Sequence, residues 1–311
     1  LAAPASREPG SGFFAFPRGA RAGTCLHAIL EDWMRGKGEL AELVEQQLQE
    51  HGLPLDWQAI ATEQLQRVLD TDLDGAGLRL SALDPARRLP ELGFTFPLRN
   101  LAIAPLRAIL QDPAHGLPQA MREAAGSLNF DLLNGFMKGF IDLTFEHAGR
   151  WYILDYKSNW LGPDASYYGG ERLEQAIAGA HYYLQYLIYL VALRRFLRLR
   201  LAGFDDSQLG GAWYLFLRGM PEAGVYFARP DDALLDALRV PRQVVVDDQR
   251  DLLDIDTTRE QVGGDQHTRR ARAELAHNDL TLLLVHVTVH RRDGELLGVQ
   301  LLGEPVDLSA R

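Results

Sequence analysis

Two stretches with the alternation of β-strands, residues 139–147 and 151–157, are joined by a short turn that contains glycine. If they form a hairpin, its register places Asp142 directly opposite Asp155. The period of two along a strand puts Lys157 on the same face as Asp155. No other feature constrains the fold as strongly, because it fixes two carboxylates and an ammonium group on one face of one sheet.

A two-residue loop at Ala148 and Gly149 pairs His147 with Arg150 and sets this register. The opposite face of the hairpin then carries only apolar and aromatic side chains, as a face that packs on a core should. Those side chains are Ile141, Leu143, Phe145, Tyr152, Leu154 and Tyr156. A slip of one residue would mix the two faces, so the pattern supports the register.

The opposed carboxylates repel each other unless a cation neutralises them. Mg²⁺ prefers oxygen ligands and is often held by one or two carboxylates together with water and substrate phosphate. Such an ion could activate water and stabilise charge on a phosphate, where Lys157 would add a point charge. A solvated sheet face with ordinary surface charges is the alternative. The chain has 29 arginines and three lysines, so a lysine at the end of this strand favours a specific role.

The composition is that of an ordinary globular protein, with 311 residues, 47% hydrophobic and 24% charged. The single cysteine, Cys25, excludes an internal disulfide or a cysteine-ligated metal cluster and predicts a reducing cytoplasm. We expect no membrane segment, because no apolar run reaches about 18 residues. A net charge of −10 is unusual for a free-standing nucleic-acid binder. Either the substrate is not nucleic acid, or other subunits deliver it.

The pattern along the chain predicts an α/β domain with a mixed central sheet flanked by helices and a helical N-terminal part. We expect a linker over residues 1–18, a domain over 19–240 and an uncharacterised tail over 241–311, with disorder as one interpretation of 245–279. Expected helices begin near Thr24 and cover 38–50, 56–72, 103–112, 171–201 and 231–238, and expected strands include 91–98 and 212–218. No Walker A, GxSxG, HExxH or GxGxxG motif supports another mechanism.

The residues Asp142 and Asp155-Tyr156-Lys157 resemble the active-site motif of the PD-(D/E)XK nuclease superfamily, with Ile141 at the nominal proline. Within it, the stretch GFMKGFIDLTFEHAGRWYILDYKSNWLG is similar to the RecB nuclease family, from bacterial RecBCD helicase–nucleases. Four other segments match in the same order, FPRGARAGTCLHAILED, RLPELGFTFPL, HYYLQYLIYLVALRRFL and GGAWYLFLRGM. The resemblance covers about residues 12–238.

The resemblance implies a restriction-endonuclease-like core and a specific set of metal ligands. His27, Asp142 and Asp155 would hold Mg²⁺, with the backbone carbonyl of Tyr156 as a further ligand and Lys157 as the catalytic lysine. Mn²⁺ would also serve, because imidazole is not a preferred ligand of Mg²⁺. Without the resemblance, His27 is interpreted as a structural side chain on a helix.

Three more positions match the family. Glu91 corresponds to an acidic residue of the first core strand, and Gln185 and Tyr186 correspond to a QY motif that contacts DNA or supports the site. The alternatives are that Glu91 is an exposed carboxylate at a strand start, and that Gln185 and Tyr186 pack and orient their neighbours.

The function implied by the resemblance is that of a Mg²⁺-dependent deoxyribonuclease of exodeoxyribonuclease V type. It would degrade DNA ends in double-strand-break repair and recombination, receiving single strands from a motor. ATP would act only through that motor, which is absent from this chain, and RecC- and RecD-like subunits are the expected partners. Two alternatives remain: a catalytically inactive scaffold or DNA-guiding module, and a stand-alone nuclease of the superfamily.

Overall fold

The computed structural model describes residues 12–130, 132–238, 288–290 and 296–298 of the chain. Most of the expected tail over 241–311, and all of the segment 245–279, lie outside these ranges. The helices are α1 (Ala20–Met34), α2 (Leu40–Glu50), α3 (Gln58–Asp70), α4 (Ile103–Gln111), α5 (Gln119–Ala125), α6 (Gly170–Gly179), α7 (Tyr182–Arg200) and α8 (Asp232–Ala237). The strands are β1 (Arg88–Leu101), β2 (Leu133–His147), β3 (Arg150–Lys157), β4 (Leu209–Phe216), β5 (Val225–Ala228), β6 (Thr288–His290) and β7 (Leu296–Gly298).

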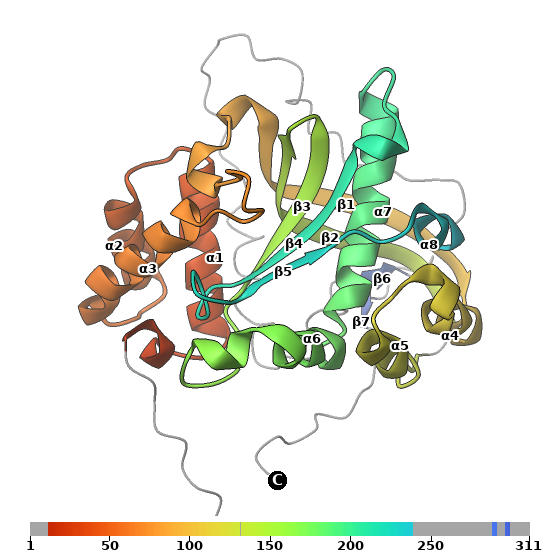
Figure 1. The fold of residues 1–311 in the computed structure, drawn as a ribbon, viewed down its shortest axis with the longest axis horizontal. Coiled ribbons are helices and arrows are strands. Elements are labelled where there is room, and N and C mark those ends of the chain that lie inside the picture. Colours follow the sequence, from red (N-terminus) through yellow and green to blue (C-terminus); the bar gives the residue numbers. More distant parts are fainter. Residues whose placement is uncertain (1–11, 131, 239–287, 291–295, 299–311) are drawn as a thin grey trace, which may run out of the picture.

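A five-stranded mixed sheet organises the molecule, in the order β1-β2-β3-β4-β5 (Figure 1). Neighbouring strands are antiparallel except β3 and β4, which are parallel. A parallel pair needs a crossover, and α6 and α7 supply it. Helices α1 to α3 lie on one side of the sheet and α7 on the other. The predicted fold class, a mixed sheet flanked by helices with a helical N-terminal part, is confirmed. A separate antiparallel pair, β6 and β7, places β6 beside β2.

The β2–β3 hairpin has the predicted register. His147 pairs with Arg150, and the ladder runs in step to the pair Leu143 and Leu154. The two loop residues have φ angles of +50° and +77°, which a two-residue hairpin turn of the favoured twist requires. The next positions in this register are the two aspartates.

The buried side chains of β2 belong to two different clusters. Leu133, Met137 and Ile141 pack with α4, α5 and α7, whereas Leu143 and Phe145 pack with α1 to α3. All five have odd numbers, so an undistorted strand would keep them on one face. We infer that β2 turns over between Ile141 and Leu143, so that odd-numbered side chains point to one cluster before this step and to the other cluster after it. The prediction that Ile141 belongs to the same core face as Leu143 is therefore wrong, although both are fully buried.

The cause of this exchange lies in the neighbouring strand. In the β1–β2 register, Glu91 would oppose Asp142, and Glu91 has a φ of +56°. This left-handed conformation is uncommon for a residue other than glycine and turns the strand sharply. The long β1–β2 pair continues beyond this point behind α7 towards α4 and α5 (Figure 1).

The structure corrects two other expectations about helices. The helix predicted over 171–201 is two helices, α6 and α7, bent by 74°. The break falls at His181, whose φ is +53° and whose Nδ1 lies 2.9 Å from the Tyr183 hydroxyl oxygen. The residue at the break is itself neither glycine nor proline. Helix α1 begins at Ala20 rather than at Thr24.

The core begins before residue 18, within the segment expected to be a linker. A short 3₁₀ helix covers Gly12–Ala15, and the side chains of Phe13 and Phe16 are buried against the α1 to α3 side. In the described part of the chain, no single helix is long and apolar enough to cross a membrane, although α6 and α7 meet that test as a bent pair.

Candidate active site

Two ion pairs meet where β2 separates from β3. The Nζ atom of Lys157 lies 2.6 Å from Oδ2 of Asp155, and Nδ1 of His27 lies 3.2 Å from Oδ2 of Asp142. The same Oδ2 of Asp142 accepts a hydrogen bond of 2.9 Å from the backbone N–H of Tyr156. The carboxylate of Asp142 on β2 thus replaces a ladder carbonyl at the end of the hairpin, and each of the two carboxylates pairs with its own basic side chain.

Helix α1 brings His27 to this point because its N-terminal part approaches β3 closely. A Cβ atom added at Gly23 would lie 2.9 Å from the hydroxyl oxygen of Ser158, the residue that follows Lys157. One turn later, the imidazole ring of His27 meets the ring of Tyr156 edge to face, with centroids 6.1 Å apart. Glycine at position 23 therefore sets the distance between the helix and the end of the strand.

Helix α7 fixes the position of Lys157. The side-chain carbonyl of Gln185 accepts hydrogen bonds from Lys157 Nζ at 3.0 Å and from the Tyr214 hydroxyl at 2.8 Å. Its amide group donates to the Tyr189 hydroxyl at 3.0 Å, and this fixes which side of the amide faces the lysine. The ammonium also lies 4.1 Å from the centre of the Tyr182 ring. The lysine is only 8% exposed, so these contacts hold its orientation.

The two carboxylates differ in their proton affinity. Burial and the neighbouring charge of Asp142 raise the pKa of Asp155 to about 6, despite the opposing effect of Lys157 and His27. For Asp142, burial acts in the same direction, but the His27 charge and hydrogen bond outweigh it and lower the pKa. Burial lowers the pKa of His27, whereas the Asp142 carboxylate raises it, with a net rise to about 9. His27 is therefore an imidazolium at neutral pH in the metal-free protein.

The donor set fits a hard divalent cation by its chemistry. Among the described residues, no three His, Cys, Asp or Glu side chains converge as a preformed metal cluster, because the carboxylates of the site are held in separate ion pairs. The buried Oδ2 of Asp155 has the Lys157 ammonium 2.6 Å away as its close cation. A buried carboxylate beside a second carboxylate is an arrangement that a divalent cation satisfies.

The remaining sequence-predicted residues lie at different distances from the ion pairs. Gln185 contacts Lys157 directly. Glu91 would face Asp142 across β1 and β2. Burial raises the pKa of the Tyr189 hydroxyl on α7, and the charge of Glu91 acts in the same direction. Tyr186 is buried, and its hydroxyl points to the sulfur of Met121 at 3.4 Å, within the core. The ligand role of the Tyr156 carbonyl stays a prediction.

Sequence reasoning missed Arg218, which follows β4 as Lys157 ends β3. Arg218 is 2% exposed, and in the described part of the chain no carboxylate pairs with it. Its guanidinium instead donates hydrogen bonds to five backbone carbonyls, those of Phe13, Phe14, Phe16, Pro17 and Ser158. It thereby ties the start of the chain to the residue after Lys157. An arginine directly after an apolar strand was the available signal.

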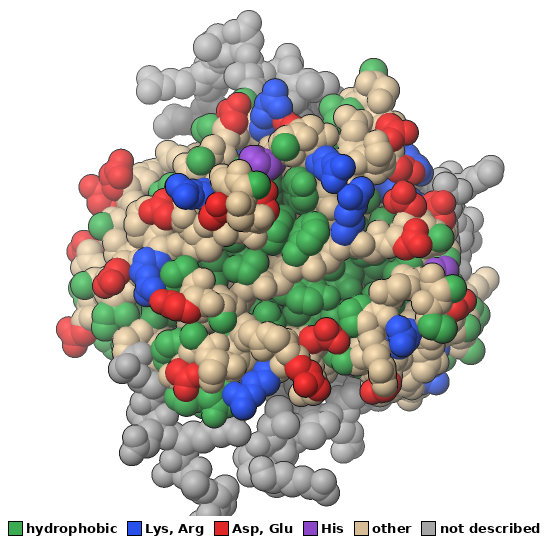
Figure 2. Space-filling view, in the orientation of Figure 1, with side chains coloured by type: hydrophobic (Ala, Val, Ile, Leu, Met, Phe, Trp, Pro, Cys, Tyr) green, Lys and Arg blue, Asp and Glu red, His purple; other side chains and the backbone are tan. Residues whose placement is uncertain are grey.

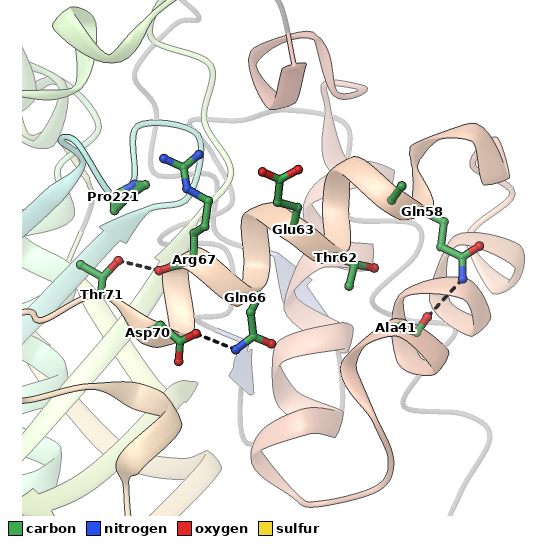
Figure 3. A pocket seen from close by; sticks show the side chains of 10 residues that line it. Ala41, Gln58, Thr62, Glu63, Gln66, Arg67, Asp70, Thr71 and Pro221 are labelled. Carbon is green, nitrogen blue, oxygen red and sulfur yellow. Dashed lines mark hydrogen bonds between the residues drawn. The ribbon is translucent and has the colours of Figure 1, made fainter.

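A concave surface on α3 shares no residue with this site. It is lined by polar side chains that mostly bond to each other or to the backbone (Figure 3). Gln66 donates to Asp70 at 2.8 Å, and the Thr71 hydroxyl donates to the carbonyl of Arg67 at 2.7 Å. These bonds stabilise the C-terminal end of α3.

Comparison with known proteins agrees with this fold. The sequence profile of the PD-(D/E)XK nuclease superfamily matches residues 14–280, and the chain belongs to this superfamily. The match extends past residue 240, where the sequence predicted the end of the domain.

The relatives named RecBCD enzyme subunit RecB are similar to this chain over most of its length. The protein from Escherichia coli strain K12 is 38% identical over 225 residues, which are 71% of this chain and 19% of that protein. The protein from Haemophilus influenzae is 34% identical over 239 residues, 74% of this chain and 19% of that protein. The protein from Mycobacterium tuberculosis strain H37Rv is 34% identical over 270 residues, which cover 74% of this chain and 25% of that protein. The chain thus spans about a fifth to a quarter of these relatives.

Proposed function

We propose that this chain is the metal-dependent DNA nuclease domain of a RecB-type helicase–nuclease, which hydrolyses phosphodiesters at DNA ends during repair and recombination. The observation that carries the proposal is the buried carboxylate of Asp155 close to the partly buried carboxylate of Asp142, with Lys157 held by Gln185 beside them. Its place is the cytoplasm, and its partners are RecC- and RecD-like subunits, with ATP consumed by a motor outside this chain.

The residues of the chain have distinct roles in this proposal. Asp142, Asp155 and His27 would hold Mg²⁺ or Mn²⁺. When bound, the ion supplies Lewis-acid activation of water and stabilises the charge on a phosphate. Lys157 carries its charge at the end of β3, where it can meet a phosphate oxygen. Gln185 orients that ammonium group, so the charge is positioned before the substrate arrives.

The surface charge supports delivery of DNA by other subunits. The net charge is −10, and on the face shown in Figure 2 acidic and basic side chains are interspersed around the rim, with hydrophobic side chains at the centre. A surface without a broad basic area binds DNA weakly by itself. The nuclease would therefore act on strands that a motor brings to it.

Cleavage of linear single-stranded DNA with and without Mg²⁺ tests this proposal. We expect metal-dependent cleavage by the parent chain and its loss in Asp155→Ala and in Lys157→Ala. The matched control is Lys37→Ala, since Lys37 also pairs with an aspartate, Asp32, at 2.5 Å but far from this site in the fold. Equal loss in the control would contradict the assignment of the site.

A folded parent that does not cleave would favour the inactive scaffold, and metal titration by calorimetry then separates the two remaining cases. Heat of binding that disappears in Asp155→Ala would show a metal site that needs the motor and partner subunits. No binding at all would leave the scaffold. Cleavage by a protein that has no motor in its complete chain would favour the stand-alone nuclease.

A further inference from the structure

Strand β2 carries a row of outward-facing side chains that the site described above does not use. Phe136, Lys138 and Phe140 occupy alternate positions, and we call them the outer row. Phe136 is 42% exposed and Phe140 is 41% exposed, and Lys138 is also exposed. Single exposed apolar residues are common on proteins, but two phenylalanines on either side of a lysine on one strand form a pattern.

Packing on the inner side of β2 forces these side chains outward. Their neighbours Met137 and Ile141 are buried in the cluster that includes α7. Between them, Gly139 makes room for the ring of Phe94, because an added Cβ would lie 2.4 Å from its Cζ atom. The inner face therefore has no space for the phenylalanines of the outer row.

The outer row has the geometry of a stacking surface. On the neighbouring strand, Gly93 has no side chain, and the ring of Phe140 reaches across it, with Cε1 3.3 Å from where a Cβ would be. Although β6 lies beside β2, both rings keep about two fifths of their surface exposed. The positions of Phe136 and Phe140 are separated by roughly 13 Å along the strand, with the ammonium group between them.

We propose that the outer row is a binding track for single-stranded DNA that leads to Asp142. Proteins that bind single strands without sequence preference combine aromatic side chains, on which bases stack, with cations that contact the backbone. Lys138 has no ion-pair partner among the described residues, so its charge is available to a phosphate. Phe140 is two residues before Asp142, so the row ends next to the site. The direction of the track rests on the proposed nuclease function, but the binding does not.

Binding is measured with the whole chain in EDTA, by fluorescence anisotropy of labelled oligo(dT) and of an abasic oligomer of equal length. We expect Phe136→Ala and Phe140→Ala each to weaken oligo(dT) binding on the order of tenfold, with little change for the abasic strand, because only bases stack. Lys138→Gln should weaken the binding of both oligomers and reduce the slope of log Kd against log salt concentration by about 0.7. The control is Phe227→Ala, as Phe227 is equally exposed, at 41%, on β5 at the other edge of the sheet.

Oligo(dT) binding that is unchanged in both phenylalanine variants would overturn the track, and so would an equal loss in Phe227→Ala. Phe140→Trp should restore binding, which excludes a general loss of folding. The two proposals fail separately. If Asp155→Ala abolishes cleavage while the row variants bind normally, the nuclease stands and the track is wrong. If the row variants lose oligo(dT) binding and the parent neither cleaves nor binds metal, the track stands and the nuclease is wrong.

Discussion

Two buried cations at the ends of adjacent parallel strands have opposite surroundings. Lys157 ends β3 and lies 2.6 Å from the carboxylate of Asp155, close to a second carboxylate. Arg218 follows β4 and is surrounded by backbone carbonyls, each accepting one of its hydrogen bonds. Burial lowers the pKa of Arg218 to about 10, which still leaves it charged at neutral pH.

The difference supports the proposal that Lys157 is held for chemistry, and it indicates that Arg218 is held for stability. Around Arg218 the hydrogen-bond partners are all backbone carbonyls, which carry no full charge. Around Lys157 two carboxylates come together, and the pKa of Asp155 is raised to about 6. Perturbed pKa values gather at functional sites. The contrast can be tested by removing each charge in turn.

The largest effect on activity is expected for Lys157→Met. Cleavage should fall on the order of 100-fold or more, as when one preorganised donor is removed from an active site. Stability should fall by only about 1 kcal/mol, because Asp155 can take up a proton when its cation is lost. Metal-dependent cleavage and urea unfolding at pH 7 measure the two effects. A large loss of stability with normal cleavage would reverse the roles assigned to the two cations.

Arg218→Met should have the largest effect on stability, a loss of about 3 kcal/mol or more, since the carbonyls it leaves behind are buried and cannot be neutralised by a proton. Urea unfolding measures it. Arg218→Lys should recover part of the loss, because an ammonium group offers three donors in place of five. If both variants are as stable as the parent, water reaches these carbonyls and the hydrogen bonds from Arg218 have no structural role.

The sequence predicted the hairpin and its two facing aspartates because the information is local. Side-chain alternation and a two-residue turn fix the register, and that register puts Asp142 opposite Asp155. The surroundings of the same residues were not predictable in this way. Gln185 is 28 positions from Lys157, and Arg218 is 205 positions from Phe13, and no periodic pattern links them. Such contacts arise from the packing of whole elements.

The errors in the predicted elements have a similar cause. The helix break at His181 comes two residues after Gly179, a single glycine through which helical periodicity continues, and the tertiary structure imposes the 74° bend. The left-handed Glu91 is likewise invisible to propensity, yet it separates the two clusters into which β2 packs. Both residues adopt conformations that cost energy locally and that the surrounding structure maintains.

Gln185→Leu should have an intermediate effect that sharpens the contrast. The lysine keeps its charge and its aspartate but loses an acceptor, so we expect about a tenfold fall in the cleavage rate. The hydroxyl of Tyr214 loses the same acceptor, which should cost about 1–2 kcal/mol of stability. Gln46→Leu is the control, because Gln46 bonds only to Glu50 on an exposed helix face. Cleavage unchanged in Gln185→Leu would mean that Lys157 needs no orientation by α7.

The smallest expected effect concerns His27 in the metal-free protein, and it depends on pH. The pKa of its imidazole is raised to about 9 when folded, against an ordinary value of 6.5, so its charge stabilises the fold fully below pH 6.5. This contribution is lost as the pH rises through about 9. The free energy of unfolding of the parent should therefore exceed that of His27→Gln by about 1 kcal/mol at pH 6, a modest difference because the side chain is partly exposed. The difference should close by about pH 10. Urea unfolding in EDTA across this range measures it. A gap that stays constant would mean that the ring is neutral throughout, and that Asp142, unlike Asp155, has no cation of its own before metal binds.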